Sequence, residues 1–307
     1  MPERKIWFDL HEEGIDSPDV AILGLPFDGS SSRQRGAAAA PDRLREISRT
    51  ADPITRSFKV IDRLTLTDFG DVPAIGPDGQ PVGQDEFLKT AGERIAALPK
   101  DSFQICLGGD NSVSIPAIRG FARKHGTDVG VIWYDAHPDL FETYQGNPDS
   151  HACALRRAID TAGIDPGRVF LLGTRSFSRT EADYIRGAQV KMITATEWLA
   201  TSTEAVAARI ADAMANLPAV YLAVDIDGFD AAHAPGTGYP MPGGIGSEAF
   251  FRLLDLLFPR IPIRALDLTE IAPRLDRNDA TSFLGVQVIL ETVGSIRRQP
   301  DAFRVKR

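Results

Sequence analysis

Two segments of the sequence carry acidic side chains at alternate positions directly after an apolar run. VIWYDAHPDL contains Asp135, His137 and Asp139, and AVYLAVDIDGFD contains Asp225 and Asp227. Side chains two residues apart point to the same side of an extended backbone, so each segment predicts a group of converging ligands. Carboxylates held together repel one another and raise each other's pKa unless cations neutralise them. These spacings therefore predict a site for divalent metal ions.

The ligand types indicate which metal such a site takes. Carboxylate oxygens with a single imidazole favour Mn²⁺ or Mg²⁺ over the metals that prefer thiolates, and the histidine favours Mn²⁺. The charge of two divalent ions balances that of the four acids, Asp135, Asp139, Asp225 and Asp227. Two ions about 3.5–4 Å apart can activate a bridging water as hydroxide. We therefore predict two Mn²⁺ ions and a hydrolytic reaction.

The segment FQICLGGDNSVSIP breaks an apolar run with two glycines and three small polar residues. This pattern is typical of a strand-to-helix turn, in which Asp110 and Ser112 cap the following helix. It also fits the rim of an active site, and Asn111 is the side chain that we expect to point toward the metals. His151 in DSHACAL and Glu270 in LDLTEIAP are candidate catalytic residues. Alternatively, these two residues only begin a helix and end a strand.

Short, nearly continuous apolar runs recur along the chain, as in buried parallel strands. They are VAILGL, FQICLG, VGVIWYDA, RVFLLGT, VKMITA, AVYLAVDID and IRALDLTEI. Helical patterns lie between them, among others at residues 85–98, 114–124, 202–216 and 246–257. This alternation predicts an α/β fold with a parallel sheet, whose carboxyl edge forms the ligand crevice. We expect one domain over residues 1–307, with a TIM barrel as the alternative fold because its strand-end acids would look similar.

The composition argues against several classes of partner. The chain has 42 Asp and Glu against 34 Lys and Arg, a net charge of −8, which gives no electrostatic basis for binding nucleic acid or an anionic membrane surface. No run approaches the ~20 apolar residues of a membrane span, and the charged N-terminus lacks the apolar core of a signal peptide. We therefore predict a cytoplasmic protein that acts on a small molecule.

Five segments, taken together, resemble the successive signatures of the arginase, agmatinase and formiminoglutamase family. In chain order they are LGGDNS, DAHPD, SHA, VDIDGFDAAHAPGTG and LDLTEIAP, and FDGSSSRQRGAAAAPDRLR resembles the substrate-side loop of that family. The resemblance covers nearly the whole chain. It implies a three-layer α/β/α sandwich with a mainly parallel eight-stranded sheet, a binuclear Mn²⁺ centre and hydrolysis of a guanidino or formimino group. It also implies a homo-oligomer, commonly a trimer or a hexamer.

The resemblance implies a role for each matching metal ligand. Asp135 and Asp225 would bridge the two metals. His137 and Asp227 would complete the coordination of one metal, and Asp139 would bind the other.

Two catalytic roles and two departures follow from the same resemblance. His151 would shuttle protons, and Glu270 would hold the planar cationic end of the substrate. Asn111 stands where most members have a histidine that ligates the first metal, so we expect that ion to bind weakly. The usual SHG motif is SHA here, with Ala152. The GGDNS variant resembles some formiminoglutamases more than it resembles arginases.

The predicted reaction is hydrolysis of a C–N bond in a linear amidine or guanidine by metal-bound hydroxide. N-formimino-L-glutamate, which would give glutamate and formamide, is the leading substrate because an anionic substrate requires cationic groups in the outer pocket. The candidate cationic groups are Arg33, Arg35, Arg175 and Arg179. Agmatinase, arginase or another guanidino-acid ureohydrolase activity is the alternative. The alternative from another class is a catalytically silent, ligand-binding relative, which only the altered residue Asn111 supports.

Overall fold

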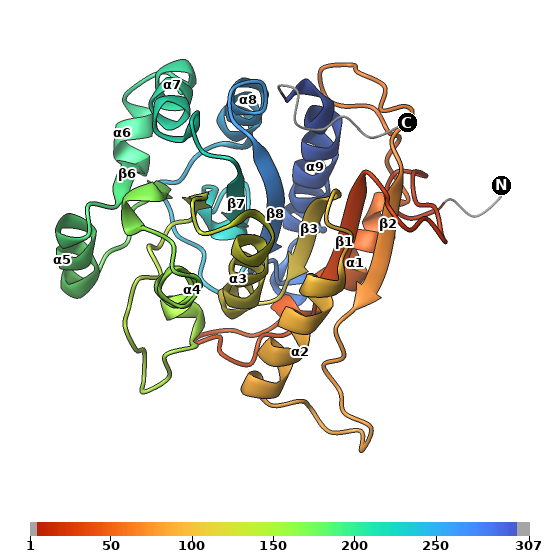
Figure 1. Ribbon diagram of the computed structural model, residues 1–307, viewed down its shortest axis with the longest axis horizontal. Helices are drawn as coiled ribbons and strands as arrows, with labels where there is room; N and C mark the ends of the chain where they lie inside the picture. Colours follow the sequence, from red (N-terminus) through yellow and green to blue (C-terminus); the bar gives the residue numbers. More distant parts are fainter. Residues whose placement is uncertain (1–4, 300–307) are drawn as a thin grey trace.

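An eight-stranded sheet runs through residues 5–299, the part of the chain that the computed structural model describes (Figure 1). The strand order is β2-β1-β3-β8-β7-β4-β5-β6, and each neighbouring pair is parallel. The expected domain of residues 1–307 also includes residues 1–4 and 300–307, which lie outside the described residues. The strands are β1 Val20–Leu25, β2 Leu66–Asp71, β3 Phe103–Gly108, β4 Gly130–Tyr134, β5 Val169–Thr174, β6 Lys191–Thr194, β7 Val220–Asp225 and β8 Ile263–Thr269.

The strands form where the sequence has short apolar runs because both faces of this sheet are covered. Every residue of β1, β3, β4, β5, β7 and β8 is buried, as expected for parallel strands between two helical layers. The edge strand β2 was not predicted from the sequence. Its sequence, LTDFGD, is polar at half its positions and only partly buried, so it lacks a continuous apolar run.

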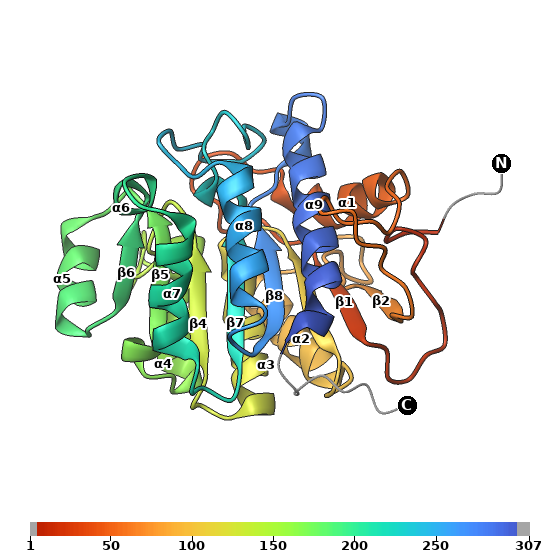
Figure 2. The same ribbon diagram turned by 90° about the horizontal axis from the view of Figure 1, so that it is seen from above.

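Helices cover the two faces of the sheet as separate layers (Figure 2). One apolar core contains side chains of α1, α6, α7, α8 and α9, and the other contains side chains of α2, α3, α4 and α5. The helices are α1 Ala40–Ser48, α2 Gln84–Ala97, α3 Ser114–His125, α4 Ala154–Ala162, α5 Arg179–Gly187, α6 Ala195–Leu199, α7 Thr203–Met214, α8 Ser247–Leu257 and α9 Ala280–Ser295. The predicted three-layer α/β/α sandwich is therefore confirmed.

The sheet is open, which excludes the alternative of a TIM barrel. Within the described chain, β2 and β6 each pair with one neighbour, whereas a closed barrel has no edge strand. The four helices predicted from periodicity are α2, α3, α7 and α8, and each observed end lies within two residues of its predicted position. No helix between residues 5 and 299 is long and apolar enough to span a membrane.

Four adjacent strands in the middle of the sheet position the polar residues that the sequence analysis selected. In spatial order these strands are β3, β8, β7 and β4. Asn111 follows β3, Glu270 follows β8, Asp225 ends β7 and Asp135 follows β4. The strands are parallel, so these four residues meet at the same edge of the sheet, where α/β proteins bind their ligands.

Candidate metal centre and active site

Asp135, His137 and Asp227 form a compact group of metal-ligand type. Nδ1 of His137 lies 3.1 Å from Oδ2 of Asp227 and 3.5 Å from Oδ1 of Asp135. One ligand atom from each of the three residues lies within 4.8 Å of the other two. Ligand bonds of about 2.0–2.2 Å to one ion place neighbouring donor atoms about 3 Å apart. Two carboxylates and an imidazole at these separations fit a single divalent cation.

Turns, and not the extended backbone that we expected, aim the DAHPD and DID side chains. β4 ends at Tyr134, before the first acid, and Asp139 has a left-handed backbone with φ of 50°. Asp225 caps the short 3₁₀ turn Ile226–Gly228, and its Oδ1 accepts a hydrogen bond from the Asp227 amide at 2.8 Å. The alternate spacing therefore brings the acids together because the chain curls around their carboxylates.

Arg175 holds the turn that carries Asp227, and its guanidinium is directed at backbone carbonyls. It donates to the carbonyl oxygens of Asp227 at 2.7 Å and Phe229 at 3.1 Å. It also donates to those of Gly173, Gly228, Met241 and Pro242. A planar guanidinium with five donors can bridge several carbonyls at once. Arg175 thus fixes the position of a candidate metal ligand.

A second group of acids surrounds the side-chain amide of Asn111. Nδ2 of Asn111 lies 2.7 Å from Oδ2 of Asp225, 2.9 Å from Oδ2 of Asp139 and 3.2 Å from Oδ2 of Asp135. The side-chain oxygen of Asn111 accepts a hydrogen bond from Oγ1 of Thr269 at 2.5 Å. The amide nitrogen therefore points toward the acids and the oxygen points away from them. In this orientation Asn111 is not placed as a metal ligand.

Burial and mutual repulsion strongly perturb these acids. Burial, followed by the charge of Asp227, raises the pKa of Asp135 to about 7 and that of Asp225 well above its usual value. Burial and the charge of Asp135 also raise the pKa of Asp139. Burial opposes ionisation of Asp227, but the adjacent His137 outweighs it and lowers the pKa of that carboxyl. Because His137 makes all the ion pairs of these acids within the described chain, protons or bound cations must relieve the remaining repulsion.

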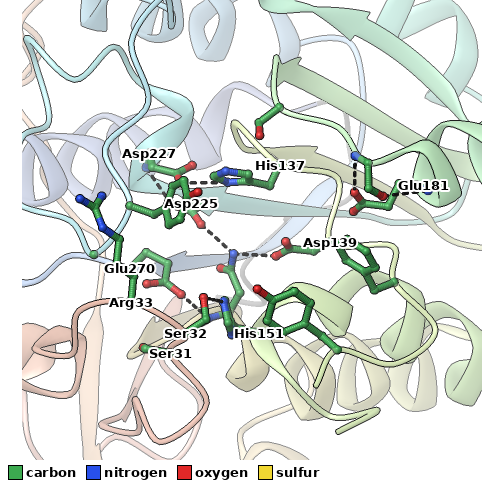
Figure 3. Close-up of a pocket in the computed structure, with 18 of the residues that line it drawn as sticks. Ser31, Ser32, Arg33, His137, Asp139, His151, Glu181, Asp225, Asp227 and Glu270 are labelled. Atoms are coloured by element: carbon green, nitrogen blue, oxygen red, sulfur yellow. Dashed lines mark hydrogen bonds and ion pairs between the residues drawn. The ribbon is translucent and has the colours of Figure 1, made fainter. Parts of the chain in front are cut away.

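A cavity of about 290 Å³ opens above these residues. His137, Asp139, Asp225, Asp227 and Glu270 line its inner part, whereas Asp135 is fully buried behind them. Figure 3 shows these side chains converging from loops on both sides of the cavity. The volume is near the lower end of the range for small-molecule sites.

His151 and Glu270 both line the cavity beside the acid cluster (Figure 3). Nε2 of His151 lies 3.1 Å from Oγ of Ser32, and burial lowers the pKa of the imidazole. Glu270 has a left-handed backbone with φ of 62°, and its Oε1 accepts a hydrogen bond from the backbone N–H of Asn111 at 2.9 Å. Burial, followed by the charge of Asp110, raises the pKa of Glu270. Both side chains therefore face the cavity without belonging to the group that fits the metal.

Of the four arginines proposed for substrate binding, Arg33 is the one that lines the cavity within the described residues. Its guanidinium carbon lies 5.4 Å from the centre of the Tyr239 ring. Arg35 is exposed and donates to the Gly29 carbonyl. Arg179 is exposed at the start of α5 and lies outside the cavity wall.

Sequence reasoning did not find the aromatic residues at the mouth of the cavity. Phe177 and Tyr239 are 42% and 46% exposed there, and the Tyr239 ring centre lies 5.2 Å from that of His137. Tyr144 lies deeper, with its ring centre 6.0 Å from that of His151. These residues come from separate loops with no common spacing, although Tyr239 directly follows the segment VDIDGFDAAHAPGTG.

Comparisons with known proteins agree with this geometry. A family model described as the Arginase family matches residues 18–294. The chain belongs to the arginase family. Members of this family are binuclear-metal hydrolases that act on C–N bonds, which supports a hydrolase over a catalytically silent relative.

Three relatives illustrate the proteins to which the chain is similar. It is 31% identical to the proclavaminate amidinohydrolase of Streptomyces clavuligerus over 88% of this chain and 85% of the relative. A solved structure of that enzyme superposes with a TM-score of 0.84 over 96% of this chain and 97% of the other. An agmatinase of Bacillus subtilis is 30% identical over 90% and 91% of the two chains. The formimidoylglutamase structure from Bacillus subtilis has a TM-score of 0.85 at 25% identity, over 98% and 94%.

Proposed function

We propose that the protein is a Mn²⁺-dependent hydrolase of a small linear amidine or guanidine that ends in a carboxylate. The observation that carries this proposal is the contrast within one cavity between an acidic inner part and Arg33, the one arginine among residues 5–299 that lines its wall. The inner acids suit a metal ion and a cationic amidinium group, and Arg33 suits a carboxylate. N-formimino-L-glutamate stays our leading substrate, and ω-guanidino acids share the same two recognition groups.

A divalent ion at Asp135, His137 and Asp227 would lower the pKa of a coordinated water and so supply the nucleophile. Oε1 of Glu270 accepts the backbone N–H of Asn111, which leaves Oε2 free of that contact. Through Oε2, Glu270 would accept hydrogen bonds from the planar amidinium nitrogens. Burial raises the pKa of Glu270, and the opposite charge of a bound amidinium would lower that pKa again and so favour the ionised carboxylate. These contacts would hold the reacting carbon beside the metal site.

His151 would transfer a proton to the departing nitrogen. Burial lowers its pKa, so the ring is neutral at physiological pH and can accept a proton before it donates one. Hydroxyl groups of Ser32 and Ser150 lie 3.1 Å and 3.2 Å from its two ring nitrogens. These hydroxyls would orient the ring between the cavity and the solvent.

Agmatine is the second candidate substrate, because curated relatives of the chain include agmatinases. Agmatine carries an amine where the proposed substrates carry a carboxylate, so Arg33 would repel it. The buried acid Glu181 in the cavity wall does not favour an amine strongly, because its two oxygens accept the backbone amides of Leu140 and Ser178. The structure therefore favours the carboxylate-bearing substrates.

A substrate panel tests the proposal. The Mn²⁺-loaded protein should release formamide from N-formimino-L-glutamate, or urea from arginine or 4-guanidinobutyrate, with a higher kcat/KM than for agmatine. Preference for agmatine would overturn the assignment of substrate polarity. Absence of turnover on the whole panel would favour a ligand-binding member of the family. Full activity of metal-depleted protein restored by Mg²⁺ alone would count against Mn²⁺.

A further inference from the structure

The second metal position expected from the family is filled in this chain by a side-chain amide. Nδ2 of Asn111 lies at the centre of three carboxylate oxygens, from Asp135, Asp139 and Asp225, at 2.7–3.2 Å. Oxygen ligands bind Mg²⁺ at about 2.0–2.1 Å, and a first-row ion would need a similarly close approach. An ion bound by these three oxygens would therefore overlap the amide nitrogen.

The direction of the Asn111 side chain is held from both ends. A carboxamide nitrogen carries two donors and no free lone pair, so only its oxygen can bind a metal. That oxygen accepts the hydroxyl of Thr269 at 2.5 Å, on the side away from the acids. The backbone amide of Asn111 is in turn fixed to Glu270 at 2.9 Å. With 3% of its surface exposed, the side chain has little contact with water that could stabilise another orientation.

In the other group of ligands, the nitrogen that faces the acids belongs to His137 and can itself bind a metal. The donor atoms of Asp135, His137 and Asp227 lie within 4.8 Å of one another, and each is an oxygen or an imidazole nitrogen that can bind a metal. Arg175 fixes the Asp227 turn through its backbone carbonyls. In both halves a side-chain nitrogen faces the acids, since Nδ1 of His137 lies 3.1 Å from Oδ2 of Asp227. The two halves differ because an imidazole nitrogen can lose its proton and bind a metal, whereas the carboxamide nitrogen of Asn111 cannot.

We propose that the protein binds one divalent ion tightly, at Asp135, His137 and Asp227, and that the Asn111 amide takes the place of the second ion. The inference rests on the metal dependence in the proposed function. The two N–H groups of Asn111 hydrogen-bond to Asp139 and Asp225, and share the more distant Asp135 oxygen. They bring no formal charge, so the cavity stays more negative than a two-ion centre and attracts the cationic end of an amidine.

The test is a count of bound Mn²⁺ together with its electron paramagnetic resonance spectrum. Metal-free protein is loaded with Mn²⁺, freed of excess ion and analysed for manganese per chain. We expect one ion per chain with the spectrum of isolated Mn²⁺, which stays uncoupled when more Mn²⁺ is added. Two tightly held ions with an exchange-coupled spectrum would overturn the inference and leave the proposed reaction intact. Absence of any bound ion would overturn both.

Three variants separate the two halves of the cluster. Asn111→His replaces the donor amide with an imidazole that can bind a metal, and should tighten the second ion by about 10–100-fold, with a coupled spectrum. Thr269→Val keeps the shape of the residue but removes the hydroxyl that holds the Asn111 oxygen. It should raise the affinity for the second ion by less than Asn111→His does. Asp227→Asn should instead lose the tight ion.

The wild-type count is decisive even where Asn111→His does not fold, and Thr269→Val then supplies the comparison. An unchanged second-ion affinity in both variants would show that the Asn111 orientation does not control the metal count, and would overturn the inference.

Discussion

The inner part of the cavity and its mouth are built in different ways. The inner acids lie at the ends of three adjacent strands, β8, β7 and β4, and are almost fully buried, from 0% exposed for Asp135 to 9% for Glu270. The mouth consists of loop residues such as Phe177 and Tyr239, each more than 40% exposed. A rigid sheet edge holds charged groups in fixed positions, whereas loops can vary without disturbing the core. We therefore propose that the inner part determines the reaction and that the mouth determines the substrate.

The loop that carries Arg33 connects the two regions. Asp110, from the GGDNS turn, accepts the backbone amide and the hydroxyl of Ser30, each at 2.9 Å. Asp28 accepts the amides of Gly36 at 2.7 Å and Ala38 at 3.3 Å. The loop is therefore anchored to the turn that positions Asn111, which keeps Arg33 at a defined distance from the acids.

The comparison predicts its largest effect for a change in the inner part. Asp135→Asn removes a ligand that no cavity water can replace, because Asp135 is fully buried. A bound metal ion stabilises the transition state by several kcal/mol, so we expect its loss to lower kcat/KM by about 10³-fold or more. Steady-state kinetics and manganese content should fall together, and Asp183→Asn on the exposed surface of α5 serves as the control. Near-normal activity of Asp135→Asn despite a loss of bound manganese would contradict the proposal that the inner part determines the reaction.

A smaller effect is expected at the boundary of the two regions. His151→Gln should lower kcat by about 10²-fold, within the usual range for a positioned acid or base. Because burial lowers the pKa of His151, the active neutral form is lost only below the usual imidazole value of about 6.5. The acidic limb of the wild-type kcat profile should therefore lie below that pH and disappear in the variant. The manganese content of the variant should equal that of the wild type. If the acidic limb of the kcat profile persists in His151→Gln, a group other than His151 causes it.

At the mouth, substitutions should change substrate preference without changing the chemistry. Arg33→Gln removes a charged hydrogen-bond donor from a carboxylate and should raise KM about tenfold for the acidic substrate, with kcat nearly constant. Arg35→Gln is a matched control, because Arg35 lies in the same loop but outside the cavity wall. The KM for agmatine should fall in Arg33→Gln. Equal effects of the two substitutions would mean that general surface charge, and not Arg33, selects the substrate.

The smallest effect on activity is expected for a buried acid outside both regions. Asp267 lies on β8 among core residues, and burial raises its pKa to about 6 from the ordinary 3.8. The folded protein therefore binds the Asp267 proton more tightly than the unfolded chain, so this residue lowers stability as the pH rises from about 4 to 6.

Asp267→Asn removes that contribution. The hydroxyl of Tyr221, which donates to Oδ2 of Asp267 at 2.9 Å, can donate to an amide oxygen as well. We expect the variant to gain on the order of 1–3 kcal/mol relative to wild type above pH 6, and to show little difference near pH 4. Urea unfolding at several pH values measures this difference, with kcat unchanged. A loss of stability at pH 7 would show that the charge of Asp267 has a partner that the wild-type contacts do not reveal.

The sequence determined much of the fold because its signals are local. Continuous apolar runs predicted seven of the strands, and periodicity located four helices to within two residues. β2 was missed because its half-exposed residues carry no such signal. The acids that follow β4 and end β7 were found by their spacing, and parallel strand direction alone is enough to bring them to one edge of the sheet.

Tertiary structure alone decided what each polar side chain faces. The amide of Asn111 is turned toward the acids by a hydroxyl on Thr269, 158 residues later in the chain. Arg175 and Arg33 look equivalent in the sequence, yet one binds backbone carbonyls and the other lines the cavity. Apolar periodicity and turn chemistry act between near neighbours and can be read directly from the sequence. Hydrogen-bond direction depends on partners that only the folded chain brings within about 3 Å.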